Sequence, residues 1–76
     1  MSNLPQISGN QLVKAFKRDG WKEKSQKGSH LKLIKILTPV GKNTIIVPLH
    51  KTLKKGTLGS ILKDAKISVE KLKKLL

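Results

Sequence analysis

Cysteine is absent from this chain of 76 residues. Its absence excludes disulfide bonds, thiolate metal sites and a thiol nucleophile, so the fold has to be held by packing alone, as in a cytosolic protein. Long hydrophobic runs are also missing. No stretch approaches the roughly 18 apolar residues that span a bilayer, and the N-terminus lacks the basic and apolar regions of a signal peptide. We therefore expect a cytoplasmic protein that is neither secreted nor inserted in a membrane.

Acidic residues are scarce: four stand against seventeen basic ones, which gives a net charge of +13. Such a surplus causes self-repulsion and favours a polyanionic partner. Arg18 is the only arginine, and the other sixteen basic residues are lysines. Lysine is a point charge suited to phosphate, whereas base edges favour the forked guanidinium, so contact with a nucleic-acid backbone is the first expectation. A merely solvated basic surface and an anionic membrane are the alternatives.

Several kinds of site lack the residues they need. The two histidines lie twenty residues apart and the four acids are scattered, so we expect no metal site and no cofactor. Gly56 and Gly59 lack the spacing of a phosphate-binding glycine loop. Ser29 neighbours His30, but adjacent residues on a strand point to opposite faces, so a serine nucleophile is not expected.

Capping patterns mark where the first helix begins and ends. Ser8 and Gln11 have the spacing of a capping box, so a helix is predicted to start at Gly9. Its apolar residues fall on one side at helical spacing, and Gly20 offers a left-handed stop. The sequence therefore predicts an amphipathic first helix with a basic outer face.

The remaining segments alternate between β-type and helical patterns. Apolar residues at helical spacing predict a helix over residues 57–65, and Ser68 caps a short final helix over residues 69–75. Three strands are predicted before them, over residues 21–26, 30–37 and 44–49. Turns are predicted between the strands, over residues 27–29 and 38–43.

These elements predict one α+β domain over residues 1–76, in which helices cover a three-stranded antiparallel sheet. A chain of this length buries roughly 60% of its unfolded surface in a single core. The predicted core is Leu12, Phe16, Trp21, Leu31, Leu33, Val47, Leu58, Ile61 and Leu62. The adjacent pair Leu33 and Ile34 shifts the alternation of the second strand, which implies either a bulge or partial burial on both faces. Pro48 suggests an edge position or the end of the third strand.

His30 is the first candidate for chemistry. It follows the turn at Gly28 and lies between Lys27 and Lys32 in sequence. Cleavage of RNA through its own 2′-hydroxyl needs only a proton acceptor or donor near neutral pH and cations around the phosphate, and this cluster supplies both. The alternative is an exposed residue at the start of a strand that contacts phosphate or nothing.

His50 follows the third strand as His30 precedes the second, so the two imidazoles are close if those strands are antiparallel neighbours. It acts either as a second acid or base or as a structural, turn-forming residue, and spacing does not decide between them. Lys54 and Lys55 precede a helix N-terminus, where they form either a phosphate clamp or a solvated pair of charges.

The order and spacing of four short motifs resemble the HicA family of mRNA interferase toxins, over about residues 7–67. The motifs are Gly28-Ser29-His30, Val47-Pro48-Leu49-His50, Lys55-Gly56-Thr57-Leu58 and Ile61-Leu62-Lys63-Asp64-Ala65-Lys66-Ile67. The resemblance implies a fold like the double-stranded-RNA-binding domain. That domain touches RNA with its first helix, the loop between its first two strands and the start of its second helix. The corresponding residues here are Lys14, Lys17 and Arg18; Lys27, Gly28, Ser29 and His30; and Lys54 and Lys55.

The family's activity would be metal-independent endonucleolytic cleavage of single-stranded or structured mRNA, with His30 as the catalytic residue. Lys27 and Lys32 would bind phosphates beside it. A HicB-type antitoxin would cover His30, and the toxin would be a monomer when free and part of a higher-order complex with the antitoxin. One position departs from the family: Lys66 stands where glycine is common, which puts only the local turn in doubt. A non-catalytic basic RNA-binding module is the rival interpretation.

Overall fold

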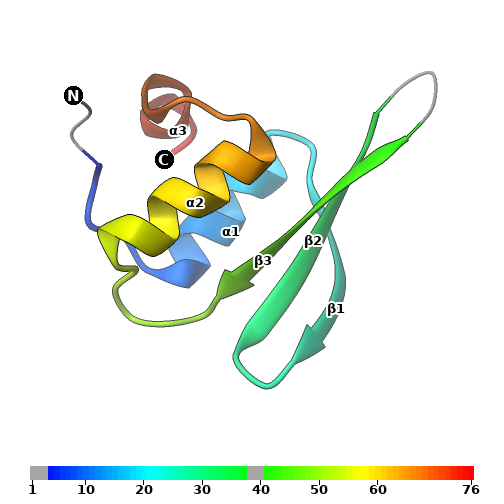
Figure 1. The fold of residues 1–76 in the computed structure, drawn as a ribbon, viewed down its shortest axis with the longest axis horizontal. Coiled ribbons are helices and arrows are strands. Elements are labelled where there is room, and N and C mark those ends of the chain that lie inside the picture. Colours follow the sequence, from blue (N-terminus) through cyan, green and yellow to red (C-terminus); the bar gives the residue numbers. More distant parts are fainter. Residues whose placement is uncertain (1–3, 38–40) are drawn as a thin grey trace.

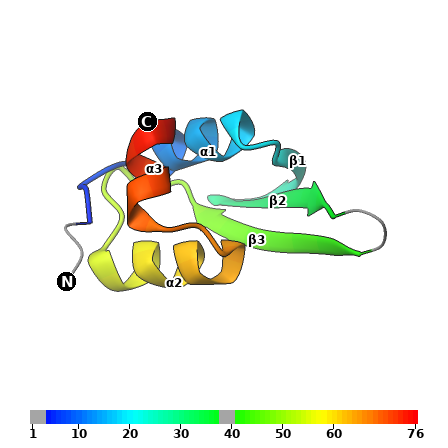
Figure 2. The same cartoon turned by 90° about the horizontal axis from the view of Figure 1, so that it is seen from above.

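The computed structural model describes residues 4–37 and 41–76. Its elements follow the order α1 (Gly9–Arg18), β1 (Lys22–Lys27), β2 (His30–Ile36), β3 (Lys42–Pro48), α2 (Lys55–Ala65) and α3 (Val69–Leu75). The strands form an antiparallel sheet in the order β1-β2-β3. The helices gather together, and the β2–β3 hairpin extends beyond them (Figure 1, Figure 2). The α+β class is confirmed, and the order of elements agrees with that of the double-stranded-RNA-binding domain.

The first helix begins at Gly9, as its capping box predicts. The Gln11 amide donates to Ser8 Oγ at 3.1 Å, and the Ser8 amide donates to Gln11 Oε1 at 2.8 Å. These two bonds satisfy donors that a helix N-terminus otherwise leaves without partners. The chain leaves the helix at Asp19, and Gly20 then adopts a φ of 96°, the left-handed conformation expected of it.

The last helix also follows its prediction, whereas the bounds of α2 and the strands differ slightly. Ser68 Oγ accepts from the Lys71 amide at 3.0 Å at the start of α3. Helix α2 begins two residues before the predicted residue 57, with Lys54 as its N-cap. β1 begins and ends one residue later than predicted, β2 ends one residue earlier, and β3 is displaced toward residue 42. Residues 38–40 of the predicted turn lie outside the described part of the chain.

One face of the sheet is buried against the helices and the other is open. Leu31 pairs with Val47 and Leu33 with Ile45, and all four side chains are buried. On the opposite face, Ile46 is 51% exposed. All nine residues of the predicted core are buried. The core also includes Ile7, Val13, Ala15, Ile45, Leu53, Ala65, Ile67 and Leu72. Burial on one face alone is what leaves the other face available for a site.

The shift in the alternation of apolar residues at Leu33 and Ile34 of β2 leads to partial burial and not to a bulge in the pairing with β3. Ile34 is half-buried, while the β2–β3 pairing continues without a break. The irregularity in the sheet lies instead in β1, where the register shifts between Glu23 and Ser25. Pro48 ends β3, and β3 is an edge strand, so the missing amide of Pro48 breaks no ladder bond.

Asp19 connects α1 to the sheet and to α3. Its Oδ2 accepts from Lys35 Nζ at 3.0 Å and from the Trp21 indole at 3.3 Å, while Oδ1 pairs with Lys71 Nζ at 3.0 Å. Burial raises the pKa of Asp19, but the hydrogen bonds and charges of Lys71 and Lys35 outweigh it, so the pKa lies below its ordinary value. The Trp21 ring also stacks on Phe16, with 5.6 Å between ring centroids. This cluster fixes the C-terminal end of α1 to β2.

Candidate functional site

A two-residue turn joins β1 to β2 and places Lys27 opposite His30. Gly28 has a φ of 60°, and a Cβ added there would meet nothing within 4 Å. Glycine is therefore favoured here by backbone conformation and not by lack of space. Because paired residues of an antiparallel ladder lie on the same face, the turn brings an ammonium group beside the imidazole.

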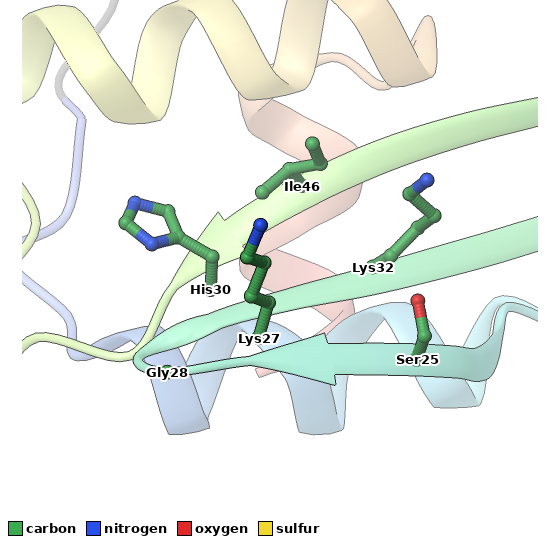
Figure 3. A pocket seen from close by; sticks show the side chains of 6 residues that line it. All are labelled: Ser25, Lys27, Gly28, His30, Lys32 and Ile46. Carbon is green, nitrogen blue, oxygen red and sulfur yellow. The ribbon is translucent and has the colours of Figure 1, made fainter.

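These side chains border a hollow of about 560 Å³ on the open face of the sheet. Figure 3 shows the side chains of Lys27, His30 and Lys32 projecting from that face. The residues that line the hollow are Ser25, Lys27, Gly28, His30, Lys32 and Ile46. Four of the residues predicted for the site, Lys27, Gly28, His30 and Lys32, are thus brought together.

The charge of this hollow is positive. The three ion pairs seen in residues 4–37 and 41–76 use Lys17, Lys35 and Lys71, so Lys27 and Lys32 keep their charges free for another partner. No carboxylate lines the hollow within the same ranges. Two ammonium groups with no local counter-ion attract an anion, and the exposed imidazole of His30 lies beside Lys27 on the same face (Figure 3).

His50 lies next to His30. The ring centroids are 6.5 Å apart and the ring planes make an angle of 71°. His30 pairs with Pro48, the last residue of β3, and the Leu49 amide donates to the Ser29 carbonyl at 2.7 Å. Ser29 contributes this backbone contact and is not among the residues that line the hollow.

The basic residues predicted on α1 lie elsewhere. Lys14 and Arg18 line a second, smaller hollow with Gln11 and Leu76. The Arg18 guanidinium donates to the Leu75 carbonyl of α3, and Lys17 forms an ion pair with Glu23. These side chains do not line the His30 hollow, and two of them are already engaged within the chain.

Lys54 and Lys55 are exposed at the start of α2. Lys54 is the N-cap and Lys55 is the first helical residue. In the part of the chain that the structure describes, no side chain caps this helix, so its first amides lack a side-chain acceptor at the end where the two exposed lysines lie. Neither residue lines the His30 hollow.

Ser25 and Ile46 line the hollow but were not among the predicted site residues. Both lie opposite Lys32 in the sheet, Ser25 from β1 and Ile46 from β3. The two-residue alternation of β3 marks Ile46 as a residue of the face opposite Val47, and that pattern was available in the sequence. Ser25 depends on the irregularity in β1, which has no sequence pattern of its own.

Within residues 4–37 and 41–76, no group of three histidine or acidic side chains is placed to hold a metal ion. Across the same ranges, none of the helices combines the length and the apolar character needed to cross a bilayer.

The fold and the open basic face define a small α+β domain of the double-stranded-RNA-binding type, with a histidine among lysines on its sheet. Residues 9–67 match a family model described as HicA toxin of bacterial toxin–antitoxin systems. This match covers more than half of the chain, which therefore belongs to the HicA toxin family. The final helix, α3, follows the matched region. A search of curated proteins found none that matches the chain.

Proposed function

We propose that this toxin is an endoribonuclease of a type II toxin–antitoxin system that cleaves mRNA without a metal ion. The observation that carries the proposal is the exposed His30 imidazole in a hollow bordered by Lys27 and Lys32, neither of which has a carboxylate partner among the described residues. The family membership supports the toxin role, and the site supports the chemistry.

In the proposed reaction the substrate provides its own nucleophile. The 2′-hydroxyl oxygen attacks the neighbouring phosphorus, so the protein needs a group that moves a proton and cations that stabilise the charge developing on the phosphate. His30 is the proton-transfer group, acting as general base or acid, because imidazole changes charge near neutral pH. Lys27 and Lys32 bind the phosphate, and Lys54 and Lys55 bind the RNA backbone farther along.

An antitoxin of the HicB type is the proposed partner. The toxin carries a net charge of +13, so an acidic antitoxin surface over His30 would exclude RNA by sterics and by charge. In this proposal the free toxin is a monomer and the antitoxin complex is of higher order. Protection of the His30 ring from chemical modification when a cognate antitoxin is added tests the contact, and full reactivity in the complex would contradict it.

The enzymatic proposal is separated from a non-catalytic RNA-binding module by incubation of the purified protein with RNA in the presence of EDTA. We expect cleavage by the wild type and none by H30A. Intact RNA with both proteins, together with binding that weakens steeply with salt, would support the binding module instead.

The lysines have a matched control on the same strand. Lys24 is exposed on β1 and does not line the hollow, so K24A removes the same charge as K27A outside the site. K27A should reduce the slope of log affinity against log salt by about one, as expected for one lost phosphate contact. A smaller change with K24A supports the assignment, and equal changes in the two variants would contradict it.

A further inference from the structure

His50 carries an inference that rests on the proposed ribonuclease function and adds a residue to it. We infer that His50 is the second proton-transfer residue of the site, and that it and His30 act on opposite oxygens of one phosphodiester. The His30 ring at the start of β2 and the His50 ring just after β3 lie next to each other, with 6.5 Å between their centroids, and both residues are exposed.

The separation suits a phosphate between the rings. An imidazole ring extends only about 1 Å from its centroid, so rings 6.5 Å apart are too distant for a direct hydrogen bond between their nitrogens. A proton-transfer group has to come within about 3 Å of the oxygen it serves. Two rings at this spacing can each reach a different oxygen of one phosphodiester, and Lys27, which lies opposite His30 in the sheet, can neutralise its charge.

Backbone contacts build this spacing into the fold. The Ser29 carbonyl, one residue before His30, accepts from the Leu49 amide, one residue before His50. The His50 carbonyl in turn accepts from the Gly9 amide at 2.9 Å. A Cβ at Gly9 would lie 2.1 Å from the Pro48 carbonyl oxygen, so the start of α1 is pressed directly against the end of β3. The main chain at His50 is therefore held from two sides.

The same contacts weigh against a purely structural role for the ring. A turn-forming histidine holds the backbone through a ring nitrogen, but the bonds at this turn are made by backbone groups. In the described ranges, no side-chain hydrogen bond involves the ring of His50 or of His30. Both rings are thus available to a substrate.

The chemistry balances with two imidazoles in opposite protonation states. The neutral ring takes the proton of the 2′-hydroxyl as the 2′-oxygen forms its bond to phosphorus. The bond from phosphorus to the 5′-oxygen breaks, and the protonated ring gives its proton to that leaving oxygen. The products are a 2′,3′-cyclic phosphate and a free 5′-hydroxyl. Proton exchange with water then returns each ring to its starting protonation state. No oxidant, reductant or metal enters the step.

The test compares single-turnover cleavage of an RNA oligonucleotide by wild type, H30N, H50N and the control K24A in EDTA from pH 5 to 9. We expect a bell-shaped profile for the wild type and K24A. H50N should cleave about 10²–10⁴ times more slowly and lose one limb of the profile. The melting temperature and RNA affinity of H50N should stay close to those of the wild type, because the His50 ring makes no hydrogen bond to another side chain or to the backbone in the described ranges.

A substrate with sulfur in place of the 5′-bridging oxygen distinguishes a proton-transfer role from a structural one, because a purely structural defect would slow its cleavage as well. Sulfur leaves without being protonated, so the variant that lacks the general acid should regain its rate, and the other variant should not. If neither variant is rescued, or if H50N cleaves normally while H30N is inactive, the role of His50 is overturned and the proposed function stands. If H30N also cleaves normally, the proposed function itself fails.

Discussion

Replacement of Asp19 by alanine should destabilise the fold more than any other removal of a charge from this protein. The carboxylate is only 11% exposed and accepts from Lys35, Lys71 and the Trp21 indole, which come from three different parts of the fold. D19A leaves these donors without their acceptor at the junction of α1, β2 and α3. D19N keeps the shape of the side chain and one oxygen acceptor but removes the charge.

The expected loss follows from these contacts. A hydrogen bond to a charged group contributes about 1.5–3 kcal/mol, and a neutral one about 1 kcal/mol. Lys71 is 51% exposed, so its pair is worth no more than a surface ion pair, about 0–1 kcal/mol. Lys35 is only 31% exposed, so solvent screening reduces the energy of its pair with Asp19 less than that of the Lys71 pair. Together these contacts predict a loss of about 2–3 kcal/mol for D19A, which lowers the melting temperature of a domain of this size by roughly 10–20 °C.

The stability that the Asp19 carboxylate contributes should decrease as the pH falls. The pKa of Asp19 in the folded protein is lowered from its ordinary value of 3.8, so folding favours the carboxylate. Its contribution is complete above the unfolded pKa and is lost as pH falls below 3.8 towards the folded pKa. Urea unfolding followed by circular dichroism should therefore show a constant difference between wild type and D19N from about pH 5 to 7, which narrows in acid. A loss for D19A below about 0.5 kcal/mol, or a difference that widens in acid, would refute this reasoning.

Three further substitutions test other parts of the structure. Lys66 has a φ of 59°, so K66G should raise the free energy of unfolding by about 0.5–1 kcal/mol in urea titrations, and a decrease would contradict the strain inferred there. G9A places a Cβ 2.1 Å from the Pro48 oxygen, so it should cost about 1–3 kcal/mol in thermal melts and slow RNA cleavage by displacing the end of β3; unchanged values would show that α1 can move away freely. The ion pair of Glu23 with Lys17 is half exposed on both sides, so E23Q should change stability by less than about 0.5 kcal/mol, and a larger loss in the same melts would show an unrecognised contact.

The sequence was most informative where structure depends on near neighbours. Ser8 and Ser68 located two helix starts, because a capping bond spans only three residues. The start of α2 was placed too late because Lys54 makes no side-chain capping bond that a pattern could reveal. Buried loop residues such as Ile7 and Leu53 were missed because a single apolar residue outside an element has no periodicity.

The same distinction applies to the candidate site. Lys27, His30 and Lys32 meet because they are near neighbours around one short turn, so their positions followed from the sequence. Ser25 depends on a shift of register in β1, and Arg18 depends on a contact with Leu75 at the far end of the chain. Neither relation has a local pattern, because both are decided by the way distant segments pack.

If His30 carries out the chemistry by which this toxin acts, its loss should abolish toxicity when the protein is expressed in bacteria. Wild type and H30N would be compared for growth arrest and for mRNA integrity, with both proteins confirmed as folded by circular dichroism. We expect growth arrest and cleaved mRNA with the wild type, and normal growth with intact mRNA with H30N. Growth arrest and mRNA cleavage by H30N at the level of the wild type would contradict it.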